Sequence, residues 1–278
     1  MLKRIDSAIE LVANLGHCSR IGWPVVLRNL TQIIESLRKF WNMNAAKIDE
    51  AFEALKTFDW GNDRAPLAPI EQAAVAAKDA AAQGELEQKL LAALGGNLNR
   101  AGKDFVCRLL VLVGSAKTAP VLAKWLGSAE DAQLARFALE RIPGSEVRQV
   151  LTDALSSVKG DQLLGVISSL GARFEPESIP ALVRLLSGGD EKVAVAAASA
   201  LGDIRGSEAA KALAAAKPGS DAVRLAVTDA RMSCAEGLLA AGKSAEALLI
   251  YKSLTGDEQP KHVKLGATRG VLACAGKK

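Results

Sequence analysis

A chain of 278 residues can bury a substantial core, as one large domain or two smaller ones. Hydrophobic residues make up 49% of it but aromatic residues only 4%, so Ala, Leu, Val and Ile must build the core. This composition favours closely packed helices over strands. The net charge of +4 is too small to indicate a nucleic-acid partner by itself.

The first 44 residues stand apart from the rest of the chain. Apolar spacing predicts two helices, at about residues 2–15 and 23–40, with a break between Gly16 and Gly22. Two of the four tryptophans, Trp23 and Trp41, fall in this segment. We expect residues 1–44 to form a helical cap or extension that covers the apolar face of a first repeat. The alternative is a helix that docks on a partner.

Residues 45–128 are expected to be helical but irregular. Helices are predicted at about 46–58 and 67–82, on either side of an irregular turn, and another begins at about Glu85. A further helix pair with a short turn is predicted from Phe105. These segments begin a repeat array that we expect to extend over residues 45–278.

The array is most regular at residues 129–217. Two leucine positions recur there with a period of thirty-one residues, and the second follows the first by twelve. Breakers containing Pro143 and Pro176 separate paired helices, so each unit is expected to be helix, tight turn, helix. The anchoring leucines are Leu139, Leu170 and Leu201, and their partners are Leu151, Leu182 and Leu213.

A set of aspartates marks the start of successive units. They recur at intervals of twenty-nine to thirty-one residues, each before an apolar periodic run. A carboxylate there satisfies free amides and complements the helix dipole, so we interpret these residues as helix caps or first-turn acids rather than catalytic groups. The four are Asp131, Asp161, Asp190 and Asp221.

Three more helices are expected after the regular units, at about 220–242, 244–254 and 259–274. Residues 217–278 contain ten bases and six acids, so the net charge of +4 is concentrated there. A solvated face with a lysine tail is the simpler interpretation, and a phosphate-binding patch is the alternative.

The repeated segments resemble those of bacterial HEAT-repeat proteins, including the short type described as phycobilisome-lyase-like. That resemblance implies an all-α fold, a right-handed α-solenoid of stacked antiparallel helix pairs. It also implies arrays of the kind found in large multidomain proteins, although this sequence shows no CxxCH haem motif. It says little about activity. The segments that carry it are 58–77, 135–146, 165–174 and 194–213.

The sequence offers little equipment for catalysis, and we expect no enzyme activity, metal or cofactor. Its two histidines, His17 and His262, lie at opposite ends, and its four cysteines are far apart without a CxxC pair. Phosphate-binding loops of the GxGxxG and GxxxxGK[ST] types are absent. Asp6 and Glu10 interrupt any signal-like apolar run, and no run is long enough to span a membrane. A cytoplasmic location is the default expectation.

A protein-binding scaffold is the leading functional hypothesis, because stacked helix pairs create an extended concave surface for a protein or peptide partner. The second helices of the regular units are expected to supply its polar groups. Nucleic-acid binding of the DNA-repair glycosylase kind is the alternative, with Trp125 and Asp131 as its suggestive residues. A bilin lyase is a third, resting only on the repeat label. The candidate groove residues are Arg148, Gln149, Asp153, Arg184 and Lys211.

Overall fold

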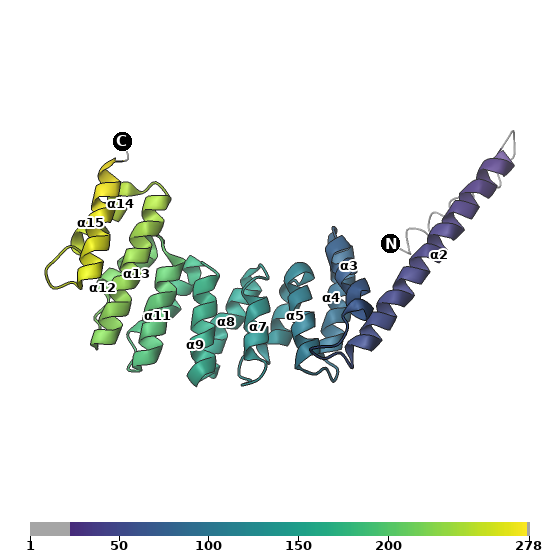
Figure 1. The fold of residues 1–278 in the computed structure, drawn as a ribbon, viewed down its shortest axis with the longest axis horizontal. Helices are drawn as coiled ribbons and strands as arrows, with labels where there is room; N and C mark the ends of the chain where they lie inside the picture. The colour runs from purple at the N-terminus through teal and green to yellow at the C-terminus, as the bar shows by residue number, and fades with distance from the viewer. Residues whose placement is uncertain (1–22, 277–278) are drawn as a thin grey trace.

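The computed structural model describes residues 23–276, and these residues are all-α, with no strand among them (Figure 1). Short breakers of Gly, Pro, Ser and Asp separate the helices, as the sequence predicts. The α-helices are α2 (Trp23–Leu55), α3 (Ala68–Ala76), α4 (Ala80–Leu94), α5 (Arg100–Val113), α6 (Ala119–Ala123), α7 (Ala132–Leu139), α8 (Ser145–Ser157), α9 (Gly160–Ala172), α10 (Ile179–Leu186), α11 (Glu191–Ile204), α12 (Gly206–Ala215), α13 (Asp221–Ala240), α14 (Ser244–Ser253) and α15 (Lys261–Gly276). The 3-10 helices are η1 (Ala65–Leu67), η2 (Ala116–Thr118) and η3 (Pro176–Ser178).

The helices stack in pairs along one long axis. One layer, which we call the front layer, is a series of helices in which each packs against the next, namely α3, α5, α7, α9, α11, α13 and α15. The helices between them pack against the front layer and form a second layer. Within this second layer α6 packs against α8, and α10 packs against α12. Figure 1 shows the front layer from α5 to α13 side by side in chain order. Each step along the stack therefore follows the order of the repeats in the sequence.

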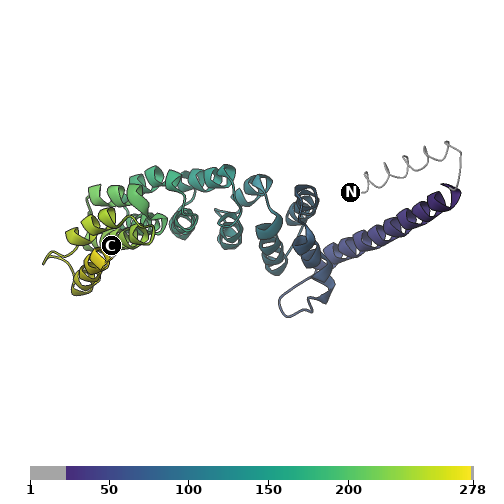
Figure 2. The ribbon, with the colours of Figure 1, turned by 90° about the horizontal axis from the view of Figure 1, so that it is seen from above.

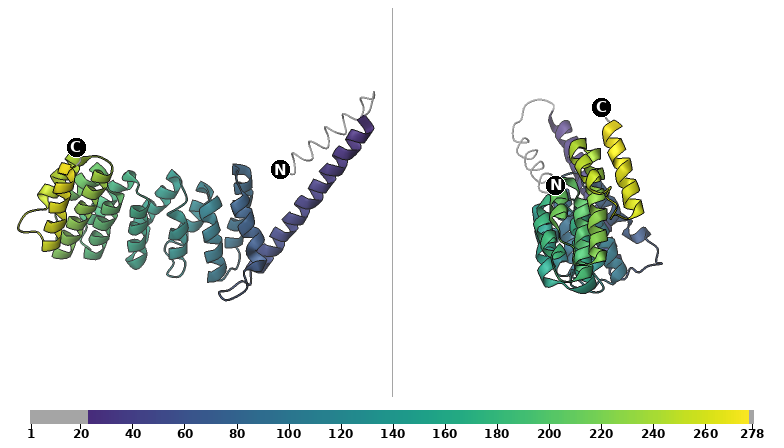
Figure 3. Two further views of the ribbon diagram at one scale, coloured as in Figure 1. Left: turned by 45° about the horizontal axis from the view of Figure 1, so that its top comes forward. Right: turned by 90° about the vertical axis from the view of Figure 1, so that its left-hand side faces the viewer.

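Helix α2 differs from the sequence prediction. A helix ending near residue 40 and a boundary at residue 44 were expected, but one helix runs without a break from Trp23 to Leu55. The physical reason is that no glycine or proline interrupts the sequence between Pro24 and Gly61. Only the last turns join the array, where Ala51 and Leu55 are buried. Figures 2 and 3 show the remainder extending away from the stacked pairs.

The helix predicted at residues 2–15 lies outside the described residues. The capping role proposed for residues 1–44 therefore stays a prediction.

The repeated leucines form the core, as predicted. The anchors on α7, α9 and α11 are fully buried, and so are their partners twelve residues later. Each of these side chains is thus shielded from water by the other helix of its pair and by the neighbouring pairs along the stack. Burial of each leucine contributes on the order of 2 kcal/mol. All six lie within 1% of complete burial, namely Leu139, Leu151, Leu170, Leu182, Leu201 and Leu213.

The recurring aspartates lie at helix starts, which confirms their predicted place. Asp190 is the N-cap of α11 and accepts a hydrogen bond from the Val193 amide at 3.1 Å. Asp161 and Asp221 occupy the first turns of α9 and α13. Asp131 begins α7, but its side chain makes no capping hydrogen bond and turns instead to the ammonium of Lys103, 2.5 Å away. Asp161, Asp190 and Asp221 thus stabilise the start of a helix, whereas Asp131 links its helix pair to the preceding one through Lys103.

The front layer is unusually closely spaced between α9, α11 and α13. A Cβ added at Gly171 would lie 2.9 Å from Ala200 Cα, and one added at Gly202 would lie 2.8 Å from Ala230 Cα. Real Cβ atoms do not approach backbone carbon so closely, so only glycine permits this helix spacing. The glycine that follows the anchoring leucine in these two repeats therefore has a packing role.

A buried arginine joins α7 to α9. Arg173, whose side chain is 5% exposed, donates from Nη1 to the carbonyl oxygens of Leu139 (2.6 Å) and Ile142 (2.8 Å). Its Nη2 pairs with the carboxylate of Glu175 at 2.5 Å. The guanidinium thereby satisfies carbonyls at the end of α7 that have no partner within the helix.

Candidate functional site

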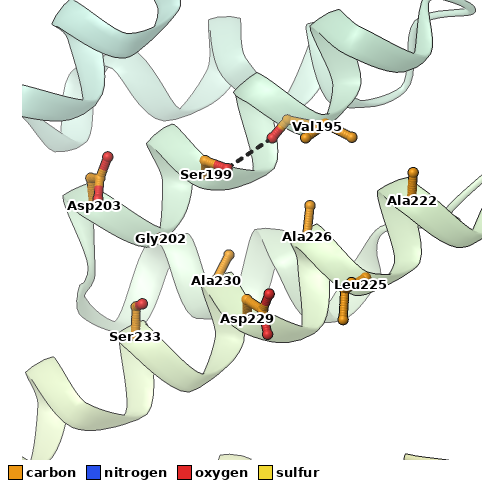
Figure 4. A pocket seen from close by; sticks show the side chains of 10 residues that line it. All are labelled: Val195, Ser199, Gly202, Asp203, Ala222, Leu225, Ala226, Asp229, Ala230 and Ser233. Carbon is orange, nitrogen blue, oxygen red and sulfur yellow. Dashed lines mark hydrogen bonds between the residues drawn. The ribbon is translucent and has the colours of Figure 1, made fainter. Parts of the chain in front are cut away.

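A shallow groove of about 420 Å³ lies between α11 and α13 on the exposed side of the front layer (Figure 4). Val195 and Leu225 line it with apolar surface, and small residues such as Ala226 lie between the two helices. Leu225 is one of the larger hydrophobic side chains that remain exposed. The groove is an accessible, largely apolar surface.

The groove exists because of the local repeat sequence. The two helices approach each other closely where Gly202 faces Ala230, and both residues line the groove. Away from this close contact, small side chains such as Ala222 leave the space between the helices unfilled. The same glycine and alanine residues that hold α11 and α13 together therefore leave a hollow beside their contact.

Polar groups in the groove are acidic or neutral. Asp203 of α11 and Asp229 of α13 both line it, and neither makes an ion pair or side-chain hydrogen bond within the described chain. Ser199 donates from Oγ to the Val195 carbonyl oxygen at 3.1 Å, the dashed line in Figure 4. Among the residues that the structure describes, no lysine or arginine lines the groove. Its electrostatics suit a cationic group beside an apolar one.

Sequence reasoning missed this groove, although a signal exists. Ser199 precedes Asp203 by four residues on α11, and Asp229 precedes Ser233 by four on α13. Thirty residues separate Ser199 from Asp229, and thirty also separate Asp203 from Ser233. The two helices therefore carry a serine and an aspartate at the same pair of positions, but in the opposite order. Polar residues four apart on an otherwise small and apolar helix face indicate an exposed face.

The five residues predicted to line a binding surface lie elsewhere, on α8, α10 and α12. Arg148 pairs with the carboxylates of Glu175 at 3.3 Å and Glu177 at 3.6 Å, so its charge is used within the chain. The Gln149 amide donates to Asp153 at 2.7 Å on the same helix. Arg184 and Lys211 are exposed. Asp153 is exposed as well and makes no ion pair within the described residues, so three of the five keep exposed charges.

The residues suggested for DNA-repair chemistry form a different kind of cluster. The ammonium of Lys103 lies 5.1 Å from the centre of the Trp125 ring and 2.5 Å from the Asp131 carboxylate. Both members of the ion pair are largely buried. Because Lys103 neutralises Asp131 and covers Trp125, this cluster joins neighbouring helices and does not present a free carboxylate beside an open aromatic ring.

A buried carboxylate on α4 also has a packing role. Glu87 is 2% exposed and accepts hydrogen bonds from the amide and hydroxyl of Ser115 at 2.7 and 2.8–2.9 Å. The Thr118 hydroxyl donates to it at 2.7 Å. All its near donors belong to the turn at η2, so this carboxylate holds that turn against α4.

Neither a metal-binding cluster nor a membrane-spanning helix occurs within residues 23–276. In this part of the chain no group of three His, Cys, Asp or Glu side chains is arranged to hold a metal ion. His262 is exposed on α15, and His17 lies outside the described residues. None of the described helices combines the length and apolarity needed to cross a membrane.

Two buried thiols give a direct test of the packing. Burial raises the pKa of Cys107 to about 12, with Asp104 and Asp131 adding to the effect, and burial raises the pKa of Cys234 to about 11. At pH 8 both thiols are protonated in the fold, whereas an unfolded cysteine with a pKa near 8.5 is partly ionised. We expect iodoacetamide to modify both cysteines in urea but only very slowly in the native protein, as measured by peptide mass spectrometry. Equal rates in the two states would contradict this packing.

Paired helices stacked in two layers, with an exposed groove between neighbouring pairs, define a helical-repeat protein. No family model matches the sequence, and no curated protein matches it.

Among solved structures, the chain is similar to a structure of lipovitellin that describes its lipid-protein interactions, with a TM-score of 0.58 and 15% identity. The match covers 83% of this chain and 27% of the lipovitellin chain, so this chain spans about a quarter of that protein. Human deoxyhypusine hydroxylase in complex with glycerol matches with a TM-score of 0.36 and 16% identity, over 69% of this chain and 97% of that one. At these identities the lipovitellin likeness shows the fold alone, and the hydroxylase match carries no argument.

Proposed function

We propose that this protein is a non-enzymatic scaffold of the HEAT-repeat kind, a right-handed α-solenoid that binds a protein or peptide partner. The observation that carries the proposal is the groove between α11 and α13. It combines exposed apolar surface at Leu225 with two carboxylates, Asp203 and Asp229, that no residue of the described chain neutralises. Grooves between stacked helices are where repeat proteins hold extended or helical segments.

The exposed bases of the second layer extend the proposal. Arg184 on α10 and Lys211 on α12 remain candidates for polar contacts with the partner, as the sequence suggested. A partner reaching both layers would meet acidic groups in the groove and basic groups on the other side. Such a pattern favours a specific orientation of the partner.

The proposal is tested by affinity capture with the tagged chain from source-cell lysate, with and without nuclease. Filling the groove with Ala222→Trp, at an exposed position, is expected to lower recovery of a stoichiometric protein at least ten-fold. Ala214→Trp is the matched control, because it places the same side chain at an exposed position on α12. Recovery that collapses with nuclease would favour nucleic acid instead, and equal recovery by both variants would exclude the groove.

A further inference from the structure

Helix α15 packs into the molecule by one face only. Its neighbours in the fold are α13 and α14. The ring of Tyr251 on α14 lies directly against Gly270, where an added Cβ would come within 2.4–2.5 Å of ring atoms. The buried positions recur every three or four residues and define the inner face, namely Val263, Ala267, Gly270 and Cys274.

The opposite face of α15 carries a regular pattern of leucine and base. Leu265 and Leu272 are 63% and 68% exposed, and they lie seven residues apart, about 10 Å along the helix. Lys261 precedes Leu265 by four residues, and Arg269 follows it by four. These four exposed residues therefore form one ridge along two to three turns, which we call the basic leucine ridge.

The ridge has an unbalanced charge. The sequence of α15 contains no aspartate or glutamate. Lys264, beside the ridge, pairs with Asp257 at 2.9 Å. Lys261 and Arg269, by contrast, make no ion pair with any residue that the structure describes. Two uncompensated cations thus lie on either side of an exposed leucine.

We propose that the basic leucine ridge docks an acidic amphipathic helix of a partner protein. Leucines spaced by seven residues match the anchor spacing of a helix laid along another helix. Carboxylates of the partner would meet Lys261 and Arg269, and its apolar side chains would cover Leu265 and Leu272.

The observations disfavour two other occupants. A second copy would bring the same positively charged helix against itself, which like charges oppose. An anionic membrane surface binds helices with a wide apolar face and many bases, whereas this ridge offers two leucines and two unpaired bases. An acidic helix is the occupant that both the charge and the width of the ridge fit.

The ridge is separate from the groove between α11 and α13. The groove is acidic and suits a cationic ligand, whereas the ridge is basic and suits an acidic one. Loss of one binding activity would therefore leave the other intact.

The test is selection of the full chain against a displayed library of amphipathic helices, in which exposed positions are randomised among Glu, Lys, Ser and Leu. We expect enrichment of helices with two or more glutamates flanking leucines. Their affinity should fall at least ten-fold for the Leu265→Glu/Leu272→Glu variant and weaken as salt is raised. Leu112→Glu, at a leucine of α5 that is 54% exposed, is the matched control and should bind as the original chain does.

Several results would overturn the proposal. Enrichment of lysine-rich or charge-indifferent helices would do so, as would an absence of enrichment. Equal binding by the Leu265→Glu/Leu272→Glu variant, with its circular dichroism unchanged, would place the bound helix elsewhere. Co-sedimentation with phosphatidylglycerol vesicles through these leucines would assign the ridge to a membrane surface, and self-association through them would assign it to a second copy.

Discussion

Replacing Gly202 by alanine is expected to destabilise the protein by about 1–3 kcal/mol, although alanine ordinarily favours helices. The added methyl group would lie 2.8–2.9 Å from the backbone and side chain of Ala230. Relief of this contact requires α11 and α13 to separate, which weakens the contacts of both helices along the stack. The measurement is the free energy of unfolding from urea titration followed by circular dichroism.

A matched glycine provides the control for this prediction. Gly84 lies in the interior of α4, and an added Cβ there meets nothing within 4 Å. Gly84→Ala is expected to stabilise the protein by roughly 0.5–1 kcal/mol, because alanine has less conformational freedom to lose than glycine. If the two substitutions shift the unfolding midpoint in the same direction, the close approach of α11 and α13 is wrong.

Removing the buried guanidinium of Arg173 is expected to cost about 3–5 kcal/mol. Arg173→Met keeps much of the side-chain volume but leaves the Leu139 and Ile142 carbonyls without a donor. It also removes the nearer of the two cations beside Glu175 and leaves only Arg148, at 3.3 Å. Arg173→Lys is expected to recover only part of the loss, because one ammonium cannot reproduce the planar fork. Thermal and urea unfolding of the three proteins measure the effect.

An exposed ion pair of the same kind supplies the comparison. Arg224 pairs with Asp221 at 2.6 Å on α13, with side chains 65% and 92% exposed. Arg224→Met is expected to change stability by less than about 0.5 kcal/mol, since water screens such pairs. A similar loss for the Arg224 and Arg173 substitutions would contradict the role given to Arg173 at the end of α7.

Local sequence patterns account for much of the fold. The leucines that recur every thirty-one residues are buried, and the aspartates between them begin helices, because periodic burial and helix capping depend on residues a few positions apart. The full length of α2 was not predicted from the sequence. A helix was expected to end near residue 40, although no glycine or proline there requires a helix to end.

The groove was not predicted from the sequence for a different reason. Asp203 and Asp229 belong to different helix pairs, and their proximity depends on the helix spacing that Gly202 and Ala230 permit. Such a spacing is a property of two surfaces in contact and cannot be obtained from one helix alone. The exposure of Arg184 and the pairing of Arg148 likewise depend on neighbouring turns.

The glycine contacts between α9, α11 and α13 also have a mechanical consequence. Helices that touch through their backbones have little room to slide or separate, whereas contacts made by long side chains can adjust by changing rotamer. The segment from α9 to α13 should therefore move as one stiff block when the rest of the stack bends. A groove inside such a block keeps its width before a partner arrives, so binding there would require little ordering of the protein.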